Sequence, residues 1–168
     1  MARTSLRDYQ RELAERLRSA DRGVAATKLG VQVGAAAWVV DLADAGEVIP
    51  VPPLTPVPLT KPWFRGMANI RGNLYSVVDF PAFLGGKPVA ASPEARLLLV
   101  GERFRAAVSL LVDRSLGLLG AQQLQGRELE GEHAPWIKAQ YGDSSGREWT
   151  ELDVPQLIQH PDFLGVAI

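Results

Sequence analysis

Short segments in which apolar and polar residues alternate recur along the chain. Alternation with a period of two is the pattern of a β-strand whose two faces meet different surroundings. The segments with this period lie at residues 29–34, 38–42, 74–80, 105–112 and 116–119. The apolar run at residues 97–100 has the length of a buried strand. Many short strands without long helices between them predict an all-β sandwich or barrel and argue against a parallel βαβ sheet.

Helical patterns occur near the two ends of the chain. Apolar residues recur at three- and four-residue spacing over about residues 4–21, which predicts an amphipathic helix. We therefore separate residues 1–23, as an N-terminal helical element, from a domain at residues 24–168. The N-terminal helix could dock on its own domain or be offered to a partner.

The C-terminal tail contains a hairpin signal and a helix signal. Turn-forming residues begin at Asp143 and lie between Tyr141 and Trp149, which predicts a β-hairpin. Asp153 can cap a short helix that has Pro155 in its first turn. The fold class is therefore mainly β, with a helix at each end.

Prolines are concentrated in residues 46–63, which hold six of the twelve in the chain. Proline donates no backbone hydrogen bond, so this segment is expected to be an extended edge or a loop rather than a central strand. It could also serve as a proline-rich ligand for another domain. The interleaved Val51, Leu54, Val57 and Leu59 instead favour packing on its own domain.

The charge balance disfavours nucleic acid as a partner. The chain has 18 basic and 19 acidic residues and a net charge of −1, whereas duplex-binding proteins concentrate Lys and Arg to neutralise phosphates. No apolar run approaches the ~20 residues of a membrane span, and the N-terminus has no signal-peptide core. We expect a cytoplasmic protein without direct membrane insertion.

Residues that carry catalytic or metal chemistry are sparse. The chain has no cysteine, and its two histidines, His133 and His160, have no metal-ligand spacing. There is no nucleophile elbow or phosphate-binding loop. Pairs of carboxylates do occur, but in a chain with 19 acidic residues most are solvated surface charges. We expect no catalytic residue, no metal and no cofactor.

A glycine-rich polar turn enters an apolar strand within residues 62–80, which read PWFRGMANIRGNLYSVVDF. Gly66 and Gly72 suit a positive φ angle or a close approach of two backbone segments. Asn69 can hydrogen-bond local backbone groups and hold the turn. This segment therefore combines a specific backbone shape with polar side chains.

Arg71 is the functional candidate within this turn. A guanidinium on a rigid turn at the mouth of a strand can reach the carboxylate or carbonyl groups of a partner. Alternatively, Arg71 could pair only with Asp79 or with a backbone carbonyl of its own domain. The residues alone leave these two roles open.

The spacing W-x-x-G-x-x-N-x-R-G-x-x-x-x-V-x-D, from Trp63 to Asp79, resembles the signature of the CheW family. In that family the signature lies between an upstream V-x-x-V-x-x-P-like segment and a later V-D-x-V-like strand. The residues at 47–52 and 110–113 occupy these places in the right order. The resemblance covers about residues 29–120.

The resemblance implies a fold and a function. Its fold would be two packed SH3-like, five-stranded β-barrels. Its function would be a non-catalytic scaffold that couples the cytoplasmic tip of methyl-accepting chemoreceptors to the regulatory domain of a CheA-like histidine kinase. Such a protein would be associated with membrane receptor arrays through its protein partners.

The resemblance also assigns roles to individual residues. The binding region is expected at Arg71, Asn69, Gly72 and Val77. Arg71 belongs to the part implicated in receptor coupling, and Asn69 and Gly72 are expected to maintain the turn that presents it. Val77 and Leu110 could line a groove for a receptor helix or could belong to the core. The residues expected to maintain the structural motif are Trp63, Gly66, Asp79 and Asp113.

Two features depart from the minimal family pattern. Ser76 stands where the family often has a proline, so this strand is expected to be more regularly paired. The leading helix, residues 73–80 and the aromatic tail resemble the members of type IV pilus chemosensory systems, which implies control of twitching motility. The alternatives are flagellar chemotaxis or another output, a small enzyme with a polar pocket, or a nucleic-acid-binding barrel with a basic face.

Overall fold

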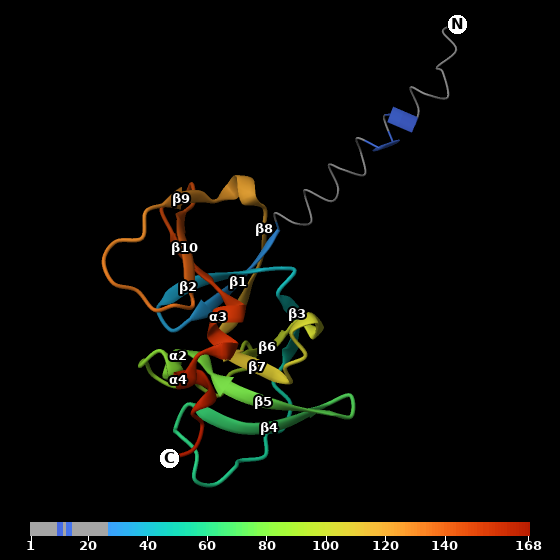
Figure 1. Ribbon diagram of the computed structural model, residues 1–168, viewed down its shortest axis with the longest axis vertical. Coiled ribbons are helices and arrows are strands. Elements are labelled where there is room, and N and C mark those ends of the chain that lie inside the picture. Colours follow the sequence, from blue (N-terminus) through green and yellow to red (C-terminus); the bar gives the residue numbers. More distant parts are fainter. Residues whose placement is uncertain (1–9, 12, 15–26) are drawn as a thin grey trace, which may run out of the picture.

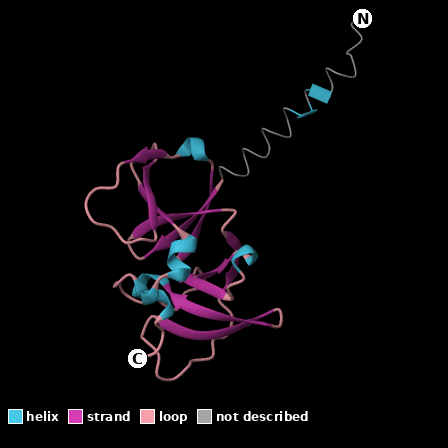
Figure 2. Cartoon of the chain, in the orientation of Figure 1, coloured by secondary structure: helices cyan, strands magenta, loops and turns pink. Residues whose placement is uncertain are grey.

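The computed structural model describes residues 10, 11, 13, 14 and 27–168 and consists mainly of β-strands (Figures 1 and 2). The expected N-terminal helix at residues 4–21 lies largely outside the described residues. Of that segment, Gln10, Arg11, Leu13 and Ala14 are described, and all four are helical and exposed.

The first sheet is built from strands near both ends of the described domain. Its order is β8-β1-β2-β11-β10-β9. The strands are β1 (Lys28–Val33), β2 (Ala36–Asp41), β8 (Arg114–Leu119), β9 (Gln125–Arg127), β10 (Ile137–Gly142) and β11 (Glu148–Leu152). All neighbours are antiparallel except β2 and β11. The short β9 makes this a six-stranded sheet.

The second sheet comes from the middle of the chain. Its order is β3-β6-β7-β5-β4. The strands are β3 (Ala45–Pro50), β4 (Phe64–Ile70), β5 (Asn73–Asp79), β6 (Arg96–Val100) and β7 (Val108–Val112). Only β5 and β7 pair in parallel. The two sheets form the upper and lower halves of the molecule in Figure 1 and confirm the expected fold class.

One hydrophobic core is shared by the two sheets. The alternating residues of β1 and β2 contribute Val31, Trp38 and Val40, and the second sheet contributes buried residues such as Leu110. The Trp38 ring meets the edge of the Phe80 ring at a centroid distance of 5.2 Å. Alternation therefore works as predicted in these strands, because it points one face of β1 and of β2 into this common core.

Three short helices close the junction between the sheets. They are α2 (Phe80–Phe83), α3 (Val154–Gln159) and α4 (Pro161–Leu164). As expected, the Asp153 carboxylate caps α3 by accepting a hydrogen bond from the backbone N–H of Gln156 at 3.1 Å. The helix α2 was not expected, since the pattern indicated a strand through Phe80 and then turns. It forms because the Asp79 carboxylate caps it and proline follows in its first turn.

The start of β7 depends on the local shape of the backbone. The strand expected over 105–112 begins only at Val108, because a short 3-10 helix, η1 (Glu102–Phe104), precedes it and Arg105 has φ 52°.

The proline-rich segment behaves as expected: β3 lies at the edge of its sheet and ends at Pro50. The expected hairpin in the tail is also present, with Tyr141 opposite Trp149.

Candidate functional site

The Asn-x-Arg-Gly segment forms a tight turn at the tip of the β4–β5 hairpin, which projects from the body of the molecule (Figure 1). Ile70 pairs with Asn73, so the loop consists of Arg71 and Gly72 alone. Both have positive φ, at 53° and 85°, as a two-residue type I′ turn requires. The Asn69 Oδ1 accepts a hydrogen bond from the Gly72 N–H at 2.9 Å. The turn is therefore rigid.

Arg71 is presented to solvent by this turn. Its side chain is 70% exposed, and its Nη2 donates a hydrogen bond to Glu47 Oε1 on β3 at 2.5 Å. This hydrogen bond raises the pKa of Arg71 and lowers the pKa of Glu47. The pairing with Asp79 considered from the sequence is wrong. An exposed ion pair contributes little to stability, so the side chain remains free to exchange partners.

Asp79 has a structural role. It is fully buried. One carboxylate oxygen accepts hydrogen bonds from Arg65 Nη1 and the Val89 N–H, both at 2.9 Å, and the other caps α2 through Ala82. The carboxylate thus fixes the end of β5 to the loop that follows.

Gly66 permits a close contact between two backbone segments. It has φ 121°, and a Cβ atom there would lie 2.1 Å from the carbonyl oxygen of Thr55. The neighbouring Met67 exchanges two backbone hydrogen bonds with Thr55, at 2.8 and 2.9 Å. A glycine is needed at position 66 because these hydrogen bonds hold the proline-rich loop against β4.

Trp63 and Asp113 also lie where they support the fold. Trp63 packs in the aromatic cluster of the helices, 5.1 Å from the Phe83 ring and 6.4 Å from the Phe163 ring. The Asp113 carboxylate accepts a hydrogen bond from the Gly34 N–H at 2.6 Å, which ties the turn after β1 to the start of β8. Gly34 itself has φ 59°.

The two candidate groove residues are part of the core. Val77 is 0% exposed and Leu110 is 1% exposed. The structure therefore corrects the suggestion that Val77 lines a surface groove, since its side chain is enclosed by the second sheet. Burial follows from the alternation of β5, which turns Val77 to the inner face while Leu74 is 60% exposed.

A surface furrow runs along the start of β5, made of two adjoining hollows. The hollows share Asn73, Tyr75, Val100 and Glu102. Arg71 and Glu47 line one end, and Leu74 and Arg105 line the other. Sequence reasoning missed Leu74, Tyr75 and Arg105. Nothing in the sequence identifies Arg105, because the surrounding fold, and not the residue type, imposes a positive φ angle on a non-glycine residue.

The first sheet holds a buried ionisable group that links three of its strands. Glu151 is 1% exposed and accepts hydrogen bonds from Lys28 Nζ and the Tyr141 hydroxyl, both at 2.6 Å. Burial, and then the bond to Glu151, raise the pKa of Tyr141, which keeps its hydroxyl protonated as a donor. The contacts join β1, β10 and β11, so this cluster cross-links the sheet.

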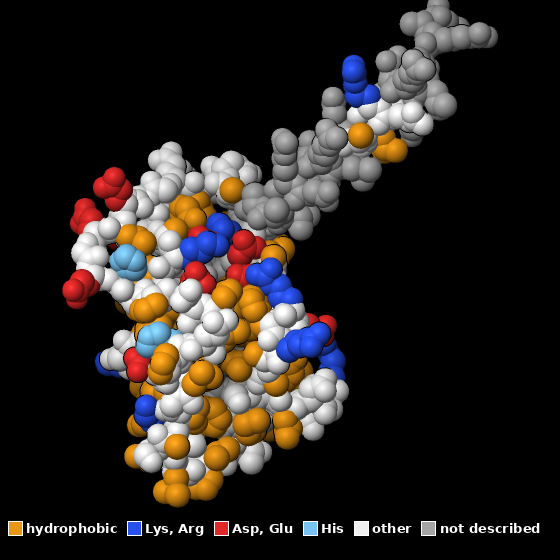
Figure 3. Space-filling model, in the orientation of Figure 1, with side chains coloured by type: hydrophobic (Ala, Val, Ile, Leu, Met, Phe, Trp, Pro, Cys, Tyr) orange, Lys and Arg blue, Asp and Glu red, His pale blue; other side chains and the backbone are white. Residues whose placement is uncertain are grey.

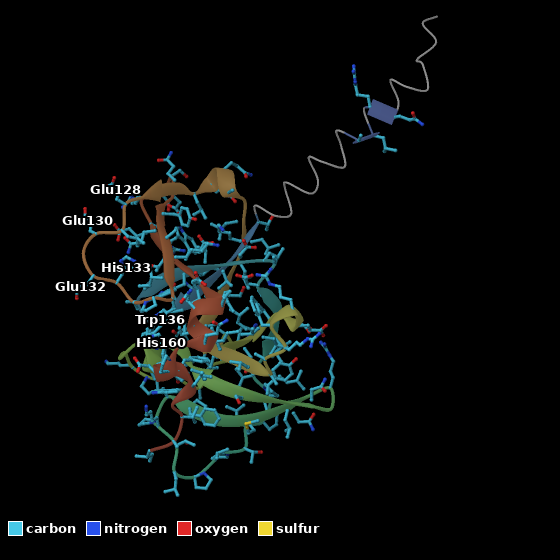
Figure 4. The ribbon with its side chains drawn as sticks, viewed as in Figure 1. Glu128, Glu130, Glu132, His133, Trp136 and His160 are labelled. Atoms are coloured by element: carbon cyan, nitrogen blue, oxygen red, sulfur yellow. The ribbon has the colours of Figure 1, made fainter. Side chains whose placement is uncertain are left out.

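The loop before β10 carries acidic side chains away from the molecule. Figure 4 shows Glu128, Glu130 and Glu132 pointing outward, whereas Trp136 and His160 lie together at the junction of the sheets. The rings of Trp136 and His160 meet edge to face at 5.0 Å. Within the described part of the chain, no three His, Asp or Glu side chains converge on a possible metal position. Nor does any helix described there have the length and hydropathy to cross a membrane.

Comparisons with known protein families give one match over most of the chain. The model of the CheW-like domain matches residues 28–162. These residues include both sheets, the hairpin turn at Arg71 and most of the C-terminal helical region. The match therefore extends well beyond the signature segment.

Curated relatives and a solved structure agree with this match. Protein PilI of Pseudomonas aeruginosa is 30% identical over 146 residues, which cover 83% of this chain and 79% of that protein. A probable chemotaxis protein CheW of Rhizobium etli is 33% identical over 98 residues, covering 58% and 59% of the two chains. The crystal structure of scaffolding protein TtCheW from Thermoanaerobacter tengcongensis superposes with a TM-score of 0.67 at 15% identity, covering 82% of this chain and 95% of that one.

Proposed function

Because the chain belongs to the CheW-like family, we propose that it is a non-catalytic adaptor that couples methyl-accepting chemoreceptors to a CheA-like histidine kinase. One surface would bind the regulatory domain of the kinase, and the surface near Arg71 would bind the cytoplasmic tip of the receptor. The adaptor would work in the cytoplasm, at receptor arrays. Coupling requires that the assembled complex favour one kinase state through contacts that differ between states.

The observation that carries this proposal is the presentation of Arg71. A rigid two-residue turn, held by Asn69 and Gly72, projects a mostly exposed guanidinium from the body of the domain. Arginine is an unusual choice at a left-handed position of a type I′ turn, where Asn, Asp and Gly are preferred. A residue held in an unfavourable conformation at a projecting tip supports a binding role.

The partner surface on the receptor is expected to be a helical hairpin. A helix that docks in a groove needs apolar contacts and a few polar groups that orient it. The furrow beside Arg71 offers both kinds of group. Individual contacts can be weak, because arrays supply many binding sites at once.

We test the adaptor role by calorimetric titration with a receptor tip and a kinase regulatory domain from the same cell. The wild-type chain should bind both in a saturable manner. Arg71→Ala should weaken the receptor interaction, leave kinase binding unchanged and leave the fold intact by circular dichroism. Absence of binding to both partners would overturn the adaptor role.

The output we propose is twitching motility driven by type IV pili, on the basis of similarity to PilI over most of both chains. The second candidate is flagellar chemotaxis or another output, which the similarity to rhizobial CheW proteins supports. Deleting the gene should abolish twitching and leave swimming intact. Loss of swimming with normal twitching would reverse the choice.

We also propose that residues 24–168 form the adaptor unit and that residues 1–23 form a separate element. The family match begins at residue 28, after this element. A chain lacking residues 1–23 should fold and bind both partners. Loss of folding in this variant would show that the element is part of the domain.

A further inference from the structure

Non-glycine residues with positive φ are concentrated at the furrow along β5. In the part of the chain described here, only Leu59, Arg71 and Arg105 have this conformation. Two of these three, Arg71 and Arg105, line the furrow at its opposite ends. Such strained positions persist only where the surrounding structure holds them, and they cluster at ligand-binding sites.

The backbone around Arg105 is fixed by its surroundings. The Arg105 N–H donates a hydrogen bond to the Glu102 carbonyl at 2.9 Å, which closes the turn of η1. The Gly101 N–H donates to the Asp44 carbonyl at 2.8 Å, and the Asp44 carboxylate pairs with Arg103. The turn therefore holds the side chain of residue 105 at one place on the surface.

The Arg105 guanidinium is available to a ligand. Its side chain is exposed, and it makes no ion pair with any described residue. Arg71, at the other end of the furrow, is paired with Glu47. Arginine is suited to binding a carboxylate because its planar group can donate two parallel hydrogen bonds.

An exposed apolar side chain lies beside this guanidinium. Leu74 is 60% exposed and lines the same hollow as Arg105, together with Ala106 and Ala107. Tyr75, half-buried, lies in the part of the furrow that the two hollows share. This end of the furrow therefore offers an apolar contact and a donor of charge-assisted hydrogen bonds within one small area.

Glu102 limits where a negatively charged group can bind. Its side chain is exposed, lines both hollows and makes no ion pair with any residue in the described ranges. A carboxylate in the middle of the furrow would meet repulsion from Glu102. The favourable place for a carboxylate is thus the Arg105 end, next to Leu74.

We infer that the furrow binds a segment of the receptor tip that places an apolar side chain on Leu74 and a carboxylate on Arg105. This inference rests on the proposed adaptor function and names the chemistry of the bound segment. On a helix, the two groups would be three or four residues apart, because these positions share one face. Arg105 is then a second binding residue, at the opposite end of the furrow from Arg71.

Two substitutions, each of which removes one charge and keeps a side chain of similar size, test the charge of the bound segment. Arg105→Gln should weaken binding of the receptor tip by roughly tenfold, the size of one charge-assisted hydrogen-bonded contact. Glu102→Gln should strengthen it, because a repulsive carboxylate is removed. Leu74→Ser should weaken it as well. Arg114→Gln, which changes an exposed arginine of β8 in the other sheet, is the matched control and should leave binding unchanged.

The experiment is a calorimetric titration of each full-length variant with the receptor tip and, separately, with the kinase regulatory domain. Opposite effects of Arg105→Gln and Glu102→Gln on the receptor interaction alone support the inference. The reverse signs would show that the bound group is basic and would overturn it. Equal receptor binding by all variants would overturn the furrow as the site but leave the adaptor function intact, whereas a wild-type chain that binds neither partner would overturn both.

A further variant separates binding from stability. Arg105→Gly removes the guanidinium and also relieves the unfavourable backbone conformation, so the midpoint of thermal unfolding should not fall. Its receptor binding should weaken as in Arg105→Gln. A variant that loses stability together with binding would instead assign Arg105 a structural role and contradict the inference.

Discussion

Single residues with special backbone or burial requirements hold the signature segment together. Gly66 lies against the Thr55 backbone, the Gly72 N–H bonds to the Asn69 side chain, and the buried Asp79 carboxylate accepts a hydrogen bond from the Val89 N–H. Arg71 differs, because its conformation is unfavourable and its ion pair with Glu47 is exposed. The signature therefore combines residues that build the turn with one that the turn presents.

At Gly66 we predict a large effect of adding one methyl group. In Gly66→Ala, the new Cβ would lie 2.1 Å from the Thr55 carbonyl oxygen, so backbone must move. We expect a loss of about 3 kcal/mol or more in the free energy of unfolding, measured by urea denaturation. Gly85→Ala is the control: φ is 90° there but nothing lies within 4 Å of the new atom, so the loss should be about 1 kcal/mol. Equal losses would contradict the close-contact explanation.

At Asp79 we predict that removing the carboxylate lowers the free energy of unfolding, because buried hydrogen-bond donors lose their acceptor. Asp79→Ala removes the cap of α2, the acceptor of the Val89 N–H and the partner of Arg65. The loss should be about 2–4 kcal/mol. Asp113→Ala removes one exposed hydrogen bond to Gly34 and should cost about 1 kcal/mol. Chemical denaturation of both variants measures the difference, and a larger effect at Asp113 would refute this ranking.

At the scale of elements, the turn between β10 and β11 depends on one carboxylate. Asp143 accepts hydrogen bonds from the Ser145 hydroxyl and the Trp149 indole N–H, and from the backbone of Ser145 and Arg147. The Ser145 hydroxyl, then the Trp149 indole, lower the pKa of Asp143 to about 2. The hairpin in the tail is thus stabilised by the ionised form of Asp143.

This lowered pKa predicts a dependence of stability on pH. The stabilisation is fully present above the unfolded-state pKa of Asp, about 4, and is lost as the pH falls toward 2, because the carboxyl group then becomes protonated in the folded state as well as in the unfolded state. The midpoint of thermal unfolding of the wild type should therefore exceed that of Asp143→Asn at pH 6. The gap should shrink between pH 4 and pH 2. A constant gap across this range would show that ionisation of Asp143 is not the cause.

The sequence predicted the strands better than the segments that join them. Alternation located strands such as β1 and β5, because burial of one face imposes that period. The alternation placed the start of β7 too early, because Arg105 adopts a left-handed conformation that cannot be predicted from an arginine in the sequence. It also missed α2, where a capping Asp and a proline start a helix of four residues, too short for a helical period.

The site was predicted in part for a similar reason. Arg71, Asn69 and Gly72 belong to a local turn, and local geometry can be read from residue type and spacing. The partner of Arg71 could not be predicted in this way, because Glu47 lies on another strand and 24 positions away in the sequence. Arg105 reaches the furrow only through the tertiary fold.

At the scale of the whole molecule, the two sheets share the largest of three buried hydrophobic clusters. Apolar side chains also reach the surface, mainly over the half that contains the second sheet (Figure 3). Each sheet has a smaller buried cluster of its own, but residues from both sheets form the largest cluster, so the two sheets also bury apolar residues against each other. The described domain should therefore behave as one cooperative unit.

We predict a single unfolding transition for this domain. Tryptophan fluorescence and far-ultraviolet circular dichroism should report the same midpoint in urea. Phe80→Ala, which removes a ring that is 1% exposed and contacts Trp38, should lower the free energy of unfolding by about 3–5 kcal/mol and keep the transitions coincident. Two separate midpoints would show that the sheets are independent folding units.

In the proposed adaptor mechanism, one chain binds a receptor and a kinase at the same time, at different surfaces. The most direct test is to titrate the receptor tip into the complex of the wild-type chain with the kinase regulatory domain. We predict that the tip binds this complex with a stoichiometry of about one per chain, as expected for one furrow per domain, and that a ternary complex sediments as one species. Displacement of the kinase domain by the receptor tip would mean that both partners compete for one surface, and it would contradict the adaptor mechanism.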